Sequence, residues 1–283
     1  MVKRTSKKSS TMAKMADLHV LYQKSVQSSE FEIGFYDERY REIRGKRKMP
    51  MVLREDFCGT ALFTKDWCES HPKRRAIGVD LCSDTLKWAM ENNIKPAGAS
   101  VAARIDLLNE NVITVVTEKV DVICAMNFSF CIFETRELLK SYFANALKGL
   151  KDDGLFFCDL MGGTNTIDAC EESHEIEGEN ATYIWEQASY NPIDNHTQCY
   201  IHFEFDDGSR IDKAFSYSWR LWTIPELKEL LLEAGFKKVQ IFWEEFIEDD
   251  DPDNDYMEGT GNYRAVTEIA QQESWLAYIV AEA

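Results

Sequence analysis

The chain has 283 residues, of which 45% are hydrophobic and 12% aromatic, and its formal net charge is −17. This composition can fill one large core, or a core with a sizeable insertion, and it excludes global disorder. The acidic balance argues against non-specific binding to nucleic acid and against docking on anionic membranes.

The beginning of the chain is basic although the chain as a whole is acidic. Residues 1–50 hold 12 Lys and Arg against 6 Asp and Glu, and the first basic residues are mixed with Ser and Thr. This mixture is typical of a solvated tail, with a targeting or RNA-binding role as the alternative. No apolar segment of a signal peptide is visible, and the most apolar run, 120–133, is too short to span a bilayer. We therefore expect a cytoplasmic protein.

Eight cysteines occur, and no two of them form a C-x-x-C pair. Four lie inside apolar runs that are typical of strands. This pattern favours reduced, buried thiols over a disulfide framework or a zinc site, so we expect no metal. The cysteines are Cys58, Cys68, Cys82, Cys124, Cys131, Cys158, Cys170 and Cys199.

Residues 15–45 have helical spacing with irregular breaks. Met15, Leu18, Leu21 and Tyr22 share one face, and an aromatic-rich segment follows before a basic loop. Such an arm, placed before the first strand of a sheet, can form a lid over the sheet's carboxyl edge or a helix packed on the core. The sequence leaves both alternatives open.

From residue 51 onward, apolar runs typical of buried strands alternate with helical periodicity, which indicates a parallel α/β sheet. Helices are expected from Ser83, a favoured N-cap residue, and over 136–150. The expected strands are 51–56, 76–80, 101–105, 120–126 and 155–159. The period then changes to strand-like alternation with polar turns, which predicts an antiparallel meander over 182–190, 199–206 and 213–222.

The end of the chain returns to the first pattern, with a helix over 224–234 that ends at Gly235, a favoured C′ residue. Strands at 239–243 and 275–280 complete a Rossmann-like, seven-stranded, mostly parallel α/β sheet with helices on both faces. A small antiparallel β insertion and an N-terminal helical arm are added to it. Four domains are expected. Residues 1–50 form a basic tail with the arm or lid, and residues 51–163 form the first part of a cofactor-binding core. Residues 164–222 form an inserted substrate region, and residues 223–283 form the end of the core, which includes the acidic loop 244–258.

The turn after the first expected strand is the most informative segment. Glu55 and Asp56 end the strand, Phe57 to Ala61 form a turn, and a helix-like run follows. Strand, tight turn and helix in this order present backbone N–H groups at a helix start, which suits a phosphate or a cofactor. Polar residues end the following strands as well: Asp80, Asp106 and Asn127.

With these residues the chain resembles the class I S-adenosylmethionine-dependent methyltransferases over about 51–163 and 223–283. In that family the first strand ends in an acidic residue followed by three alternating glycines. Here the same positions read Glu55-Asp56-Phe57-Cys58-Gly59-Thr60-Ala61, so only the central glycine is present. The resemblance implies the family's fold, an activity of the EC 2.1.1 type, and S-adenosyl-L-methionine as cofactor. A nicotinamide dinucleotide enzyme would need G-x-G-x-x-G at this turn, which Phe57, Gly59 and Leu62 do not fit.

The resemblance also implies roles for individual residues. Asp80 would accept hydrogen bonds from the two ribose hydroxyls, as a carboxylate can, and Leu81 would pack against the adenine. Asp106 would accept from the adenine amino group, and Asn127 would lie beside the transferable methyl group. The full expected cofactor site is Tyr22, Arg54, Glu55, Phe57, Gly59, Thr60, Asp80, Leu81, Asp106, Leu107 and Asn127.

Arg54 is an unusual residue for a buried strand, because an unpaired charge costs several kcal/mol there. We expect it to pair with a carboxylate. The two candidates are the neighbouring Glu55 or Asp56 and the methionyl carboxylate of the cofactor, and the sequence does not choose between them.

A substrate would bind outside the carboxyl ends of the strands. The arm, the aromatic-rich meander and the ends of two strands are candidates for its wall. Aromatic faces and carboxylates suit an amine or ammonium group, and the acidic loop 244–258 either attracts a cationic substrate or is only solvated. The expected substrate-binding residues are Phe128, Asp159, Trp185, Glu186, Tyr200, His202 and Trp222.

Methyl transfer from a sulfonium is an in-line displacement that depends mainly on alignment, and a general base is needed only if a proton must leave early. His202, Asp159 and Tyr217 are candidate bases, and we assign no catalytic residue. The expected function is methyl transfer to a small-molecule acceptor, including a cationic or amine-bearing one. The alternatives are a protein or RNA methyltransferase and a non-catalytic scaffold that binds no cofactor. The oligomeric state stays open.

Overall fold

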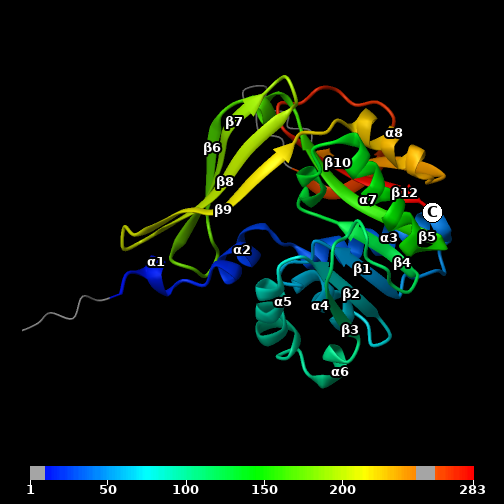
Figure 1. Cartoon of the computed structure of the whole chain (residues 1–283), viewed down its shortest axis with the longest axis horizontal. Coiled ribbons are helices and arrows are strands. Elements are labelled where there is room, and N and C mark those ends of the chain that lie inside the picture. The colour runs from blue at the N-terminus through cyan, green and yellow to red at the C-terminus, as the bar shows by residue number, and fades with distance from the viewer. Residues whose placement is uncertain (1–9, 247–258) are drawn as a thin grey trace, which may run out of the picture. The chain divides into compact units, whose positions relative to one another are not determined.

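The computed structural model describes residues 10–246 and 259–283. They form two compact units, whose elements are labelled in Figure 1. The core unit consists of Ser28–Thr166 and Arg220–Ala283, and the insertion unit consists of the described residues up to Gln27 together with Ile167–Trp219. Most of the acidic loop expected at 244–258 lies outside the described residues.

The core unit contains one mixed sheet. Its strands are β1 Val52–Asp56, β2 Arg75–Asp80, β3 Ile105–Asn109, β4 Val120–Ala125, β5 Leu150–Gly162, β10 Lys238–Phe246, β11 Gly259–Val266 and β12 Trp275–Glu282. Their order is β11-β10-β12-β5-β4-β1-β2-β3. The pairings from β5 to β3 are parallel, whereas β12 pairs antiparallel with both β5 and β10, and β11 pairs antiparallel with β10. Every residue of β4 is buried, as expected for a parallel strand covered on both faces.

The predicted Rossmann-like, mostly parallel α/β fold is confirmed, but the predicted count of seven strands is wrong. Within the described residues the sheet has eight strands, and β11 is the additional one. Its sequence, Gly-Thr-Gly-Asn-Tyr-Arg-Ala-Val, has no apolar alternation, because the strand lies at the edge of the sheet and most of its residues are exposed. Sequence periodicity does not detect a strand that buries so little of either face.

The predicted strand over 101–105 is also wrong. Ala99–Ala102 form a short helix, α6, and β3 begins only at Ile105. Val101 is buried in the hydrophobic core as the apolar anchor of α6, and one apolar residue among alanines gives the same short signal in a helix as in a strand. Asp106 is therefore the second residue of β3, and Asn109 is the residue that ends it.

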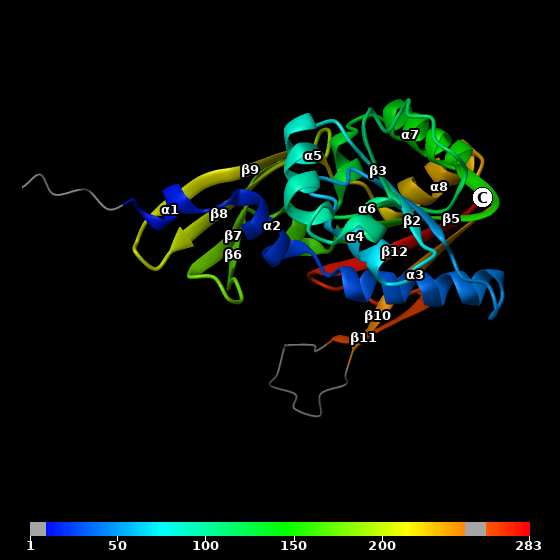
Figure 2. The ribbon, with the colours of Figure 1, turned by 90° about the horizontal axis from the view of Figure 1, so that it is seen from below.

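Helices cover both faces of the core sheet. Besides α6, they are α3 Ser29–Arg44, α4 Leu62–Glu69, α5 Ser83–Ala89 with a π-helical turn at Met90–Ile94, α7 Arg136–Gly149 and α8 Ile224–Ala234. Figure 2 shows α3 on one face of the sheet and α7 with α8 on the other. On the α3 face, Phe35 and Tyr36 pack against Phe157 of β5 and Phe63 of α4. Among the described helices, none is long and apolar enough to cross a membrane.

The insertion unit is built on a four-stranded antiparallel sheet in the order β6-β7-β8-β9. Its elements are α1 Met12–Met15, α2 Leu18–Val26, β6 Cys170–Glu175, β7 Ala181–Asn191, β8 His196–Phe205 and β9 Arg210–Arg220. The three strands predicted for the meander are present as β7, β8 and β9. The sequence pattern misses β6, a polar edge strand with nearly all residues exposed. One face of this sheet packs against Leu21 and neighbouring residues of α1 and α2, so the described arm before Gln27 covers this sheet.

All eight cysteines are free thiols, and six of them are buried. The expectation of buried thiols is wrong for Cys82, which is exposed, and for Cys170, which is half-buried. Cys82 directly precedes α5 and Cys170 begins the exposed edge strand β6, so neither has the two covered faces of a central strand.

Thr223 begins α8 with a capping box. Its hydroxyl accepts from the backbone N–H of Glu226, and the Glu226 carboxylate accepts from the backbone N–H of Thr223 at 2.9 Å. We expect Thr223→Ala to lower the free energy of unfolding by about 1 kcal/mol, as measured by urea denaturation. Thr223→Ser keeps the hydroxyl and should stay within about 0.5 kcal/mol of the parent. Equal losses in the two variants would contradict the capping role.

Candidate functional site

The turn between β1 and α4 has a left-handed backbone at three alternating positions. The dihedral φ is 61° at Phe57, 50° at Gly59 and 52° at Ala61. These are the three positions at which the resembled pattern carries glycine, and side chains at two of them disfavour this conformation. Such strained backbone persists where the surroundings hold it, often at functional sites. The turn thus has the backbone shape that glycines would favour although it contains one glycine.

Asp80, at the end of β2, holds this turn in place. Its Oδ2 accepts from the backbone N–H of Gly59 at 2.9 Å, and its Oδ1 accepts from the backbone N–H of Cys82 at 2.7 Å. An ionised carboxylate has about four acceptor positions, so about two remain for a ligand. The next residue, Leu81, is 66% exposed. Hydrogen-bond acceptors and an apolar side chain therefore stand next to each other at the end of β2.

Glu55 joins the end of β1 to the first turn of α4. Its Oε2 accepts from the backbone N–H of Thr64 at 2.9 Å and from the Thr64 hydroxyl at 2.5 Å. Burial raises the pKa of Glu55 to about 8, because the two hydrogen bonds offset only part of the lost hydration. Thr60, in the turn itself, is buried and accepts at its carbonyl oxygen from the side chain of Asn93 at 2.7 Å.

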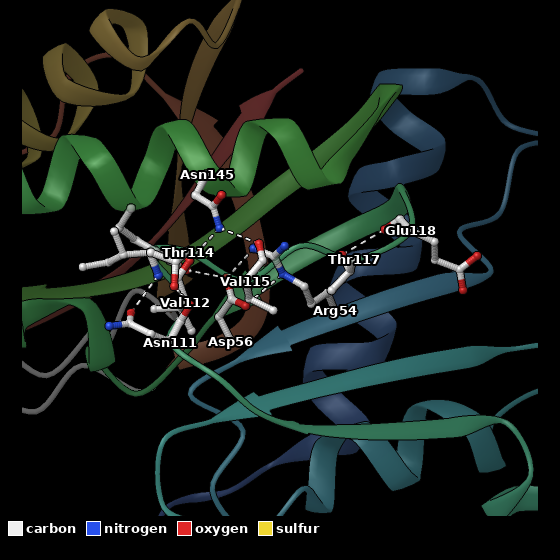
Figure 3. A network of polar contacts seen from close by, with 11 residues as sticks. Arg54, Asp56, Asn111, Val112, Thr114, Val115, Thr117, Glu118 and Asn145 are labelled. Atoms are coloured by element: carbon white, nitrogen blue, oxygen red, sulfur yellow. Dashed lines mark hydrogen bonds and ion pairs between the residues drawn. The ribbon is translucent and has the colours of Figure 1, made fainter.

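Arg54 and Asp56 form a buried ion pair on the opposite face of β1 (Figure 3). Nε and Nη2 of Arg54 donate to Oδ1 and Oδ2 of Asp56 at 2.9 and 3.0 Å, and the Tyr142 hydroxyl donates to Oδ2 at 3.0 Å. The Arg54 and Asp56 side chains are both wholly buried. Of the two expected pairings, the structure has the one with the neighbouring carboxylate. The predicted contact of Arg54 with the cofactor has no structural support.

A second left-handed turn follows β4. The dihedral φ is 56° at both Asn127 and Phe128, and their N–H groups donate to the two carboxylate oxygens of Asp159 at 2.8 and 2.9 Å. Asp159 belongs to β5, and burial raises its pKa to about 6. The structure thus brings three predicted site residues together. Both oxygens of Asp159 accept from this turn, so its carboxylate holds the turn in position.

Asp106 lies near the amino end of β3, away from the carboxyl ends of the strands. In the register of β2 with β3, Asn109 pairs with Asp80, and Asp106 lies three residues earlier. The Asp106 side chain is 64% exposed, and its Oδ2 lies 3.9 Å from Nη2 of Arg75. The expectation that Asp106 ends a strand, on which its predicted adenine contact rests, is wrong. Asn109 occupies that place, and its side-chain amide donates to the carbonyl oxygens of Asp80 and Leu81 at 3.1 and 2.9 Å.

Two predicted aromatic residues of the insertion unit, Trp185 and Tyr22, pack against its hydrophobic core. The Trp185 ring is half-buried, and its centroid lies 5.8 Å from that of Tyr217 and 5.9 Å from that of Trp219. The Tyr22 ring of α2 lies 5.0 Å from Phe215 of β9. These rings form the packing between the arm and the sheet, and nothing in this unit by itself distinguishes them as a substrate wall.

His202 and Glu186 form a hydrogen-bonded pair on the other face of that sheet. His202 Nε2 lies 2.8 Å from Glu186 Oε2, and Nδ1 accepts from the backbone N–H of Lys213 at 3.1 Å. Because Nδ1 accepts, the ring proton belongs on Nε2, which donates to Glu186. Both ring nitrogens are therefore engaged, which favours a structural role over that of a base. The Lys213 ammonium lies 3.9 Å from the centroid of the Tyr200 ring, so this ring is covered by a cation.

Two other predicted residues belong to the core unit. Trp222 follows β9, is 3% exposed and lies under the Arg220 guanidinium, whose Cζ is 3.8 Å from the ring centroid. Leu107 pairs with Gly78 in the register of β2 with β3 and packs against the hydrophobic core. Trp222 therefore has a packing role in the structure, and Leu107 lies two residues before the end of its strand.

Glu32 is a residue that the strand-end pattern misses. It lies on α3, one helical turn before Phe35 and Tyr36, and it is half-buried. Burial, followed by the charges of Asp159 and Glu55, raises its pKa to about 8. The sequence contains a signal for it, because a carboxylate three and four residues before two core aromatic residues shares their helix face.

No family model matches the chain, and no curated protein sequence matches it. Several solved structures do match over nearly the whole chain. An S-adenosylmethionine-dependent methyltransferase from Clostridium acetobutylicum is 16% identical, with 93% of this chain and 96% of that chain covered and a TM-score of 0.66.

Two further solved structures have similar agreement. CalS10 from Micromonospora echinaspora, an amino pentose methyltransferase with S-adenosylmethionine bound, is 13% identical over 94% of this chain and 96% of its own, with a TM-score of 0.63. The sugar N-methyltransferase KedS8 from a Streptoalloteichus species is 15% identical over 94% of this chain and 92% of its own, also with a TM-score of 0.63. At these identities the likeness shows the fold alone. The chain has the fold of the class I S-adenosylmethionine-dependent methyltransferases, with an antiparallel insertion sheet.

The raised pKa values of Glu32 and Glu55, each about 8, predict that stability depends on pH. A raised pKa means that the folded state binds the proton more tightly, so the stabilisation is complete below the ordinary pKa of 4.5 and is lost as the pH rises through 8. Between about pH 5 and 8, each group should lower the free energy of unfolding by up to about 1.4 kcal/mol per pH unit. Glu55→Gln should flatten this profile in urea denaturation, and an unchanged slope would contradict the raised pKa.

Arg54→Met removes the cation of the buried pair and leaves Asp56 with Tyr142 as its remaining partner. We expect a loss of about 3–5 kcal/mol in the free energy of unfolding, measured by chemical denaturation, because an uncompensated buried charge remains. The double variant Arg54→Met with Asp56→Leu removes both charges and should recover part of this loss. If the double variant were no more stable than the single one, pairing would not explain the effect.

Proposed function

We propose that this chain is an S-adenosyl-L-methionine-dependent methyltransferase that acts on a small-molecule acceptor. The observation that carries the proposal is the hydrogen bond from the N–H of Gly59 to Asp80, which joins the left-handed turn after β1 to the carboxylate that ends β2. Ligands of open α/β sheets bind at the carboxyl ends of the strands, where the strand order reverses. In this sheet the order reverses between β1 and β4.

The residues at this edge fit the parts of the proposed cofactor. The remaining acceptor positions of Asp80 suit the two ribose hydroxyls, and the exposed Leu81 offers an apolar surface to the adenine. The open side of Gly59, where a Cβ would meet no atom within 4 Å, leaves room for close approach to the backbone. When bound, the cofactor would supply a methyl group made electrophilic by positively charged sulfur.

We propose an amine as the acceptor. CalS10 is described as an amino pentose methyltransferase and KedS8 as a sugar N-methyltransferase. Another solved structure that matches this chain, MtfA, is described as a glycopeptide N-methyltransferase. The turn of Asn127 and Phe128, fixed by Asp159, would orient the acceptor. A neutral amine needs no base before it attacks, because its proton can leave after the new bond forms.

The cofactor site can be tested by calorimetry with S-adenosylhomocysteine. We expect Asp80→Ala to weaken binding by about tenfold or more, because the ribose loses a charged acceptor and the turn loses its tie. Asp106→Ala is the matched control, since it removes an exposed carboxylate three residues before the strand end, and its affinity should equal that of the parent. Equal losses in the two variants, or none in Asp80→Ala, would count against the proposed site.

The acceptor can be identified by transfer of a tritiated methyl group onto a fractionated metabolite extract, followed by mass spectrometry of the labelled product. We expect a labelled small molecule that carries a methylated nitrogen. Label only in the protein or RNA fraction would replace the small-molecule proposal with a macromolecular one. A chain that binds neither S-adenosylmethionine nor S-adenosylhomocysteine would be a scaffold, and the proposal would be wrong.

A further inference from the structure

We propose that Glu32 binds a positive charge of the cofactor, either its ammonium or its sulfonium group. The inference rests on the proposed function and adds to that site a residue that neither the turn nor the strand ends contain. It is carried by the position of Glu32, by the charges around it and by the absence of a protein partner for its carboxylate within the described residues.

The strands first define where the site lies. Glu55, Cys124, Asp159 and Tyr278 come from β1, β4, β5 and β12, and each stands two residues from a member of the hydrophobic core that α3 covers. Because side chains two residues apart in a strand share a face, all four side chains lie on the α3 face of the sheet. Glu55 and Asp159 also lie in the carboxyl halves of their strands, on the two sides of the point where the strand order reverses.

The direction of α3 brings Glu32 to the same place. At the end of α3, Arg44 donates to the carbonyl oxygens of Asp153 and Gly154 near the start of β5, and Tyr36 stacks on Phe157 with ring centroids 4.2 Å apart. The helix therefore runs antiparallel to β5. One helical turn before Tyr36, about 6 Å along the axis, comes Glu32.

Two residues after Phe157, about 6.6 Å along the strand, comes Asp159. Both steps lead towards the carboxyl end of β5, so the carboxylates of Glu32 and Asp159 lie close to each other. In agreement, Asp159 contributes the largest effect of any single charge on the pKa of Glu32.

The charges that raise the pKa of Glu32 come from acids. Asp159, Glu55 and Asp66 of α4 raise its pKa after burial does, and Glu32 in turn raises the pKa values of Tyr36, Cys124 and Tyr278. None of these groups from α3, α4, β1, β4, β5 or β12 is a cation. A half-buried carboxylate among other carboxylates is unfavourable unless a positive charge joins it.

Glu32 also differs from the two acids beside it in its partners. Glu55 accepts two hydrogen bonds from Thr64, and Asp159 accepts two from the turn after β4. Within residues 10–246 and 259–283, the Glu32 carboxylate makes no hydrogen bond and no ion pair with the protein. It is the acid of this group whose carboxylate has no hydrogen-bond donor among the described residues, and a positively charged ligand matches it.

The test is calorimetry on the full chain with three ligands. S-Adenosylmethionine carries both cations, S-adenosylhomocysteine carries only the ammonium, and 5′-methylthioadenosine carries neither. We expect Glu32→Gln to weaken S-adenosylmethionine binding by about tenfold or more and to leave 5′-methylthioadenosine within about twofold. Glu30→Gln, an exposed acid on the same helical turn, is the matched control and should bind all three ligands as the parent does.

Each outcome has one meaning. A loss for S-adenosylmethionine and S-adenosylhomocysteine assigns the ammonium to Glu32, and a loss for S-adenosylmethionine alone assigns the sulfonium. Unchanged S-adenosylmethionine affinity in Glu32→Gln overturns the inference, as does an equal loss for all three ligands. A parent chain that binds none of them instead overturns the proposed function itself.

Thermal denaturation separates binding from folding. Because Glu32→Gln removes an acid from among other acids, its thermal midpoint should equal or exceed that of the parent. A lower midpoint would show that Glu32 stabilises the fold and would overturn its assignment as a ligand-binding residue. Glu32→Asp, which keeps the charge on a shorter side chain, should restore part of the lost affinity without lowering the midpoint.

Discussion

The left-handed turn between β1 and α4 is the constraint on which the rest of the site depends. Three of its positions have positive φ, and two of them carry side chains, so the backbone is strained unless its surroundings hold it. Three contacts do so: Asp56 is fixed inside the protein by Arg54, Glu55 binds the start of α4 through Thr64, and Gly59 donates to Asp80. Asp56 and Glu55 lie on opposite faces of β1, and Asp80 belongs to the neighbouring strand β2.

The same arrangement concentrates negative charge at one edge of the sheet. Asp56 is neutralised by Arg54 on the α7 face, whereas Glu55 and Asp159 on the α3 face are held by N–H and hydroxyl donors without a cation. Burial then raises the pKa values of these two acids. A site of this kind costs stability near neutral pH and offers a favourable place to a cationic ligand. The excess of acidic residues in the whole chain is thus also found at this edge of the sheet.

Sequence patterns located the parts of the site that depend on buried strands. The ends of β1, β2 and β4 were predictable because each strand buries apolar residues on both faces, and their alternation places Arg54 and Asp56 on one face of β1. Strands at the sheet edges were not predictable in the same way. β6 and β11 bury little, and β3 was misplaced because the buried Val101 of α6 imitates a strand, which moved Asp106 away from the position assigned to it.

By itself, the sequence determined the fold class, the turn after β1 and the residues that end its central strands, because burial and turn chemistry are local and repeat at fixed intervals. Only the tertiary structure decided which partners those residues take. Arg54 pairs with Asp56 through two buried hydrogen bonds. Asp159 accepts from a turn that begins 32 residues earlier in the chain, at Asn127. Glu32 lies near Asp159 because α3 runs antiparallel to β5. The effect of Asp159 on the pKa of Glu32 depends on the distance between the two carboxylates in space, which their spacing along the chain does not give.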